Sequence, residues 1–236
     1  MTPRTAVPPS QVHPVRADRL RADARRNHEQ ILDAARDLFV ERGAGAPLED
    51  IAQRAGVGIG TLYRRFVNRD TLMREVVLQA LTGTTEVAHK ALAEEAEPFA
   101  ALARYMHTAL ELRVSAVIPV LLERVDMNHG AVKAARATSA RAVQLLLDAA
   151  HADGSLPPDV AFGDIGLMLV RLARPLPGPI PAELNDRLAH RHLDLLIEGL
   201  RPHPERRAVD GGLSLADLRA IGVDTAARAA RRRGSA

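Results

Sequence analysis

The side chains with the clearest chemical potential lie in residues 48–66 of this sequence. Hydroxyl and guanidinium groups follow one another there, at Thr61, Tyr63, Arg64 and Arg65. A guanidinium group binds phosphate oxygens, or the edge of a guanine through two parallel hydrogen bonds, and a hydroxyl group also binds phosphate. These residue types therefore indicate contact with a nucleic acid rather than the making or breaking of covalent bonds.

Two short helices joined by a glycine bend are predicted to hold these side chains in place. Apolar residues recur at helical spacing in residues 48–55, which gives the first helix one buried face. Gly56 stands where the chain must turn with a positive φ, a conformation that costs glycine little. In the second helix Leu62 and Phe66 are four residues apart and point inward, so the polar side chains around them point outward. The pattern predicts a helix-turn-helix motif at about 48–67, whose second helix enters the major groove of DNA.

A family resemblance supports this interpretation, and it rests on the segment IAQRAGVGIGTLYRRF at 51–66, followed by NRDTL at 68–72. These residues resemble the signature of TetR-family transcriptional regulators, and residues 31–39 with Gly43 are similar to the first helix of that family. The resemblance covers roughly residues 25–85. It implies a homodimeric DNA-binding regulator, most often a repressor that a small-molecule effector releases from a palindromic operator.

The resemblance also implies individual DNA contacts. Tyr63 is expected to give its hydroxyl group to a phosphate, although it could instead only pack at the helix edge, and Arg64 is expected to reach a base or a phosphate. Arg65 faces either the DNA or the first helix, while Arg69 matches the position of a phosphate-binding lysine. Arg25 reaches the DNA backbone or forms an exposed charge pair on the first helix. The predicted DNA-contacting residues are Arg25, Gly58, Ile59, Gly60, Thr61, Tyr63, Arg64, Arg65 and Arg69.

The composition favours an all-α protein with its positive charge near the two ends of the chain. Alanine, leucine and arginine dominate, and aromatic residues make up only 3%. Residues 1–85 hold 13 arginines against 10 acidic residues, whereas residues 86–208 hold 14 basic and 16 acidic residues. The sequence has no cysteine, no apolar run near the ~20 residues that cross a bilayer, and no secretory signal. We therefore expect a cytoplasmic protein without a membrane partner, and the family resemblance implies a bacterial one associated with the nucleoid.

Proline and glycine divide the chain into four parts. We expect a disordered arm at 1–16, a three-helix DNA-binding domain at 17–85, a helical effector-binding and dimerisation domain at 86–208, and a partly disordered extension at 209–236. Within the third part, helices are predicted at about 98–114, 120–128, 131–152, 159–173 and 182–200. The last two have wide apolar stripes, which favour them as the dimer interface, although they could also only close the domain's own core.

Other classes of function find less support in the sequence. No glycine-rich phosphate loop after a strand, nucleophile elbow or cluster of metal ligands is present, so we expect no enzyme, no metal site and no cofactor. An interaction protein that keeps the fold and acts through protein partners, without a small effector, is the second hypothesis. A helical enzyme with a polar pocket is a third and much weaker one.

Overall fold

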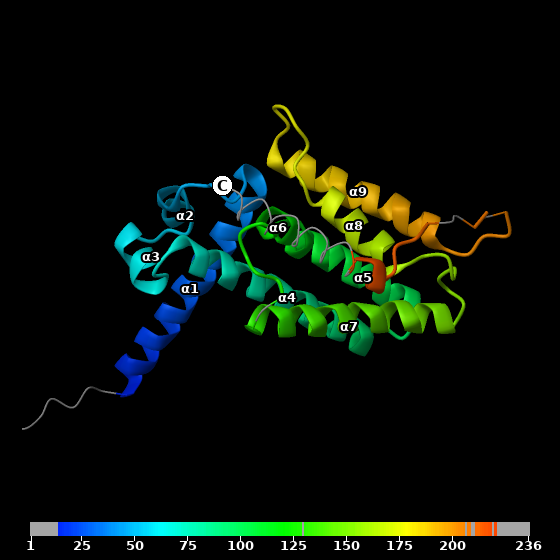
Figure 1. Cartoon of the computed structure of the whole chain (residues 1–236), viewed down its shortest axis with the longest axis horizontal. Helices are drawn as coiled ribbons and strands as arrows, with labels where there is room; N and C mark the ends of the chain where they lie inside the picture. The colour runs from blue at the N-terminus through cyan, green and yellow to red at the C-terminus, as the bar shows by residue number, and fades with distance from the viewer. Residues whose placement is uncertain (1–13, 129, 206, 209–210, 219, 221–236) are drawn as a thin grey trace, which may run out of the picture.

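Helices α1–α3 form one end of the molecule, α5–α9 form the other, and α4 runs from the first group into the second (Figure 1). This computed structural model describes residues 14–128, 130–205, 207–208, 211–218 and 220. Within these ranges the chain is helical and contains no strand, which confirms the all-α prediction. The helices are α1 (Pro14–Arg42), α2 (Leu48–Arg54), α3 (Ile59–Arg65), α4 (Arg69–Glu94), α5 (Pro98–Glu111), α6 (Val114–Leu121), α7 (Gly130–Ala152), α8 (Phe162–Leu172) and α9 (Ala182–Leu200).

The predicted disordered arm at 1–16 overlaps the first helix. Residues 1–13 lie outside the described part, but α1 already begins at Pro14, before the predicted start at residue 17. Proline is tolerated in the first turn of a helix, because the amide hydrogen that it lacks would have no partner there. The first helix therefore starts at Pro14 rather than at residue 17.

The α2–α3 bend is built as the sequence predicts. Gly56 has φ +68°, and its amide donates to the carbonyl of Gln53 at 3.1 Å while the amide of Val57 donates to the carbonyl of Ala52 at 3.0 Å. This pair of hydrogen bonds is the Schellman arrangement that ends a helix on a left-handed glycine. Leu62 is buried beside it, so α3 is held at a fixed angle to α2.

Helix α4 joins the two groups of helices without interruption. Its first turn is capped by Asn68, whose Oδ1 accepts a hydrogen bond from the Thr71 amide at 2.8 Å. Its buried residues extend from Leu72 to Ala91, and it packs against α1 at one end and α5, α6 and α7 beyond. The predicted boundary at residue 85 thus lies inside a continuous helix, and one hydrophobic core extends through both parts.

The helix predicted at 120–128 is wrong. The break falls at Arg113, which has φ +49°, and α6 (Val114–Leu121) then contains Pro119. An internal proline removes one backbone hydrogen bond, which a short helix packed against α4 and α8 tolerates here. Helices α7 and α9 have the predicted extents to within one residue, whereas α8 begins three residues after the predicted residue 159.

Residues 211–218, within the predicted extension, fold back against the start of α8. The amide of Gly163 donates to the carbonyl oxygen of Leu213 at 2.7 Å. A Cβ atom on Gly163 would lie only 2.7 Å from the same oxygen, so the two backbones approach because residue 163 has no side chain. Ser214 caps a helical turn at 215–218 through hydrogen bonds with Asp217.

Candidate DNA-binding interface

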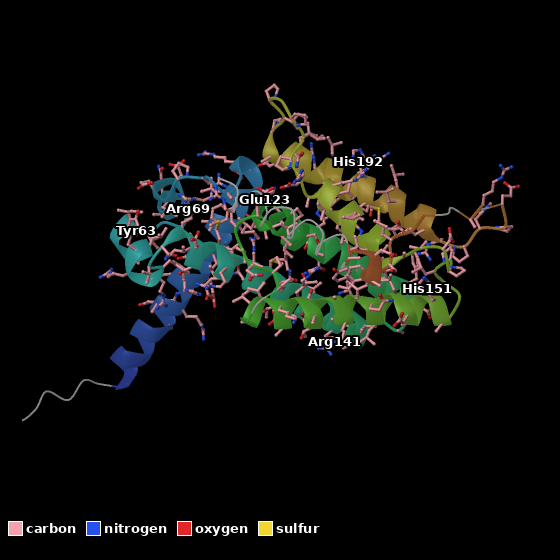
Figure 2. All side chains as sticks on the ribbon, viewed as in Figure 1. Tyr63, Arg69, Glu123, Arg141, His151 and His192 are labelled. Carbon is pink, nitrogen blue, oxygen red and sulfur yellow. The ribbon has the colours of Figure 1, made fainter. Side chains whose placement is uncertain are left out.

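The outward face of α3 carries the polar side chains that the sequence predicts to be exposed. Leu62 and Phe66 are only 1% and 2% exposed, whereas the Tyr63 side chain is 51% exposed and Arg64 is also exposed. Figure 2 shows Tyr63 at the end of the molecule formed by α3, away from α5–α9. The i, i+4 spacing of the two buried residues is thus what turns the hydroxyl and guanidinium groups outward.

Thr61 and Arg64 lie one helical turn apart and already contact each other. The Arg64 Nη2 donates to the Thr61 Oγ1 at 3.0 Å. This hydrogen bond holds the guanidinium group against the exposed face of α3. The arrangement offers several hydrogen-bond donors within one turn, which suits contact with phosphates and base edges.

The start of α3 is open to solvent. Gly58 is the N-cap residue, and a Cβ atom on Gly58 or Gly60 would have nothing within 4 Å. Ile59, between them, is 37% exposed although it is apolar. A phosphate can therefore approach the first backbone amides of α3 closely, while Ile59 offers only an apolar contact, such as a thymine methyl group.

Arg65 is exposed as well, but its side chain is directed towards α1. Its Nη2 donates to the carbonyl oxygen of Ala24 on α1 at 2.6 Å, so the side chain lies towards the first helix. Of the two directions that the sequence leaves open for Arg65, the structure has the one towards α1. Arg25 lies beside it, 76% exposed, with its Nε 3.7 Å from the Glu29 carboxylate, which is the charge pair that the sequence allows for this residue.

Arg69 is tied to the loop between α1 and α2. Its Nη1 donates to the carbonyl oxygens of Ala44 and Ala46 at 3.1 and 2.6 Å, and the side chain is half-buried. This position braces the motif, and Figure 2 shows Arg69 close to it. A contact between Arg69 and a phosphate stays a prediction.

Two further ion pairs fasten α2 to α1. Arg42 pairs with Asp50, and Arg54 pairs with Glu41 through two hydrogen bonds of 2.8 and 2.9 Å. The hydrogen bonds that Arg54 donates to Glu41, opposed in part by burial, raise the pKa of Arg54 above its ordinary value. Because carboxylates already compensate these arginines, they contribute less to an attractive surface for DNA than Arg64 does.

Sequence reasoning missed one residue at this interface, His28. Its ring stacks on Phe66, with ring centroids 5.3 Å apart and an interplanar angle of 18°. Together with Ala24, Arg25 and Arg65 it lines an open hollow of about 440 Å³ between α1 and α3. The only signal in the sequence is that Arg25 and His28 are three residues apart on one helix, which does not reveal the contact with Phe66.

No group of three or more His, Asp or Glu side chains in the described ranges is arranged to hold a metal ion. None of the helices in those ranges combines the length and hydrophobicity that crossing a lipid bilayer requires.

Family models match both parts of the chain. The model for "Bacterial regulatory proteins, tetR family" matches residues 31–76, and that for "Transcriptional regulator SbtR-like, C-terminal domain" matches residues 97–202. Among curated proteins, the HTH-type transcriptional regulator UidR of Escherichia coli (strain K12) is 32% identical over 63 residues, which are 26% of this chain and 32% of that protein. The chain thus matches about a third of the length of this curated relative.

Solved structures resemble a larger share of the chain. The TetR transcriptional regulator SCO0520 of Streptomyces coelicolor is 32% identical, with a TM-score of 0.54 over 74% of this chain and 98% of that one. A TetR regulatory protein of Mycobacterium vanbaalenii is 29% identical, with a TM-score of 0.53 over 78% and 99%. Since both halves match their family models and a solved relative is covered almost end to end, the chain belongs to the TetR family of bacterial transcriptional regulators, with its helix-turn-helix DNA-binding motif in residues 48–66.

Proposed function

We propose that the protein is a homodimeric repressor that binds a palindromic operator and leaves it when a small molecule binds among α4–α9. The observation that carries this proposal is the pair of exposed residues Tyr63 and Arg64 on α3, with half-buried Thr61 beneath Arg64, held outward by buried Leu62 and Phe66. A single short helix contacts few bases, so two copies on a two-fold site are needed for useful specificity. Its place of action is then the chromosome in the bacterial cytoplasm.

The α8–α9 pair supports the dimer. Helix α9 buries Ala189, Leu193 and Ile197 against its own chain, yet Leu184, Leu195 and Leu196 of the same helix stay exposed. Leu167 of α8 is exposed as well. Two apolar faces on one helix indicate one face for the core and one for a partner, and a second copy of the chain gives a closed two-fold contact.

The packing of helix α4 supports a mechanism by which a bound ligand releases the protein from the operator. Two reading helices must fit successive major grooves, about 34–36 Å apart. Because α4 packs against α1 and also against α5, α6 and α7, a change in how it sits in the bundle changes the separation of the two α3 helices. A ligand that favours the altered separation lowers operator affinity by shifting the population of states.

Selection from a random DNA library, followed by affinity measurements on the selected duplex, tests the proposal. We expect a palindrome, and we expect a protein with both Tyr63→Ala and Arg64→Ala to lose operator binding while it stays a folded dimer. Arg141→Ala, on exposed α7 surface outside the DNA-binding module, is the matched control and should bind normally (Figure 2). Unchanged binding by the double variant, or selection without any enriched sequence, contradicts the proposal.

A thermal-shift screen of small molecules separates this function from that of an interaction protein without an effector. A true effector raises the melting temperature by mass action and lowers operator affinity in the same concentration range.

A further inference from the structure

A cavity of about 180 Å³ lies where the end of α5, the end of α8 and the start of α9 meet. Its apolar wall includes Leu110, Leu172 and Ala189, and its polar wall includes Glu111 and His190. Sites for drug-sized ligands typically measure about 300–1,000 Å³, so this one suits a molecule of only a few heavy atoms. All of its lining residues belong to α5, α8, α9 or the loops beside them, and none belongs to α1–α4, so it is separate from the DNA-binding interface.

The proton positions on two histidines can be deduced from their partners. His107 Nε2 lies 3.1 Å from the Asp194 carboxylate, so this nitrogen carries the proton and donates. In the neutral ring, His107 Nδ1 is then an acceptor, and it lies 3.2 Å from His190 Nδ1. While His107 is neutral, the proton between the two rings belongs to His190, which leaves His190 Nε2 as an acceptor that a ligand can use.

The charged side chains around the cavity also favour a ligand that donates hydrogen bonds. Asp186 pairs with Arg113 at 2.9 Å, whereas Glu111 has no ion-pair partner within the described part of the chain. Leaving His190 aside, the lining has two carboxylates, Glu111 and Asp186, against one guanidinium group, Arg113, a net charge of −1. A ligand that brings a positive charge and N–H donors satisfies both Glu111 and the acceptor of His190.

Arg113 connects the cavity to the DNA-binding end of the molecule. It is the only non-glycine residue with positive φ in the described ranges, at +49°, and it forms the joint between α5 and α6. Helix α6 packs against both α1 and α4. A ligand that disturbs the pairing of Arg113 with Asp186 therefore acts on a strained joint whose next helix contacts the DNA-binding module.

We propose that this cavity binds a small protonated amine with a short apolar group, its ammonium group at Glu111 and His190 and its apolar part against Leu110, Leu172 and Ala189. This inference deepens the proposed function, on which it rests, because it gives the chemical class of the effector.

Calorimetric titration of the full chain with n-butylamine tests the site without DNA. We expect butylamine to bind, and butyrate and butanol of matching size to bind at least about tenfold more weakly, since the charged hydrogen bond to Glu111 is lost. Glu111→Gln should weaken butylamine binding by at least about tenfold. Glu86→Gln, an exposed glutamate on α4, is the matched control and should leave binding unchanged. Melting curves verify that each variant is folded.

Substitution at position 190 tests the acceptor on His190. His190→Gln keeps an acceptor atom and should bind butylamine more tightly than His190→Ala, which has none. His192→Ala, on another face of α9, should leave binding unchanged.

Three results overturn the inference: no butylamine binding in the millimolar range, equal binding of butyrate, or an unchanged affinity in Glu111→Gln. Bound butylamine that leaves operator affinity unaltered overturns the effector role. A chain that binds no DNA at any butylamine concentration refutes the proposed function instead, while the calorimetric result still stands on its own.

Discussion

Arg69 has a structural role in the fold, and we also predict that it contacts a DNA phosphate. Its Nη1 donates to the carbonyl oxygens of Ala44 and Ala46, so it closes the α1–α2 loop against the start of α4. A guanidinium group has five N–H donors, and two hydrogen bonds to one nitrogen leave others for a phosphate. Arg64, by contrast, has only Thr61 of its own helix as a partner among the hydrogen bonds of the described residues, so its contribution to folding is small.

Replacing Arg69 separates these tasks. We expect Arg69→Ala to lower the free energy of unfolding by about 1 to 2 kcal/mol, because two backbone carbonyls lose their donor, and to weaken operator binding. Arg69→Lys keeps the charge but not the planar fork, so it should recover operator affinity more fully than stability. Urea denaturation and fluorescence anisotropy measure the two effects. Arg74→Ala, one turn along α4, is the control; equal stability of Arg69→Ala and Arg74→Ala would show that the carbonyl contacts contribute nothing.

At the scale of the element, the start of α4 depends on one amide side chain. Asn68 Oδ1 accepts hydrogen bonds from the Thr71 amide at 2.8 Å and from its hydroxyl group at 3.0 Å. Asn68→Ala should lower the free energy of unfolding by about 1 kcal/mol, whereas Asn68→Asp keeps an N-cap acceptor and should be nearly neutral. Urea denaturation of the three proteins checks this. A fully stable alanine variant would contradict the capping role.

The elements that the sequence predicts well are those with strong local signals. The bend at Gly56 was predictable because a left-handed helix end requires glycine, and α9 because apolar residues recur along it between two prolines. The break between α5 and α6 was not predictable, because an arginine with positive φ has no sequence signature. In addition, Pro119 falsely indicates a helix end. Local periodicity therefore gives the helices, and strain imposed by tertiary packing shifts their ends.

The features of the candidate DNA-binding interface also fall into those that local sequence predicts and those that it does not. The exposure of Tyr63 and Arg64 follows from the four-residue spacing of buried neighbours within one helix. The contacts of Arg65 with Ala24, and of His28 with Phe66, join residues about forty positions apart and exist only because α1 lies beside α3. A single sequence carries no local signal for such contacts.

At the scale of the whole molecule, the exposed leucines of α9 make the dimer testable. Leu195 is 60% exposed, so Leu195→Asp should leave the single chain folded, yet it would bury an unpaired charge in a dimer. We expect the dimer dissociation constant to rise at least about tenfold in sedimentation experiments, with a parallel loss of operator affinity. Leu145→Asp, on exposed α7 surface, is the matched control. Sedimentation of Leu195→Asp as an unaltered dimer would place the two-fold contact elsewhere.

The unbroken α4 has a consequence for building chimaeras between relatives. Each residue of an α-helix turns its successor by about 100° and advances it by about 1.5 Å. Adding or removing one residue of α4 between Asn68 and the helices of the bundle would rotate α3 by about 100° around the axis of α4. A chimaera that joins the DNA-binding helices of a relative to this bundle must therefore keep the number of residues along α4 unchanged.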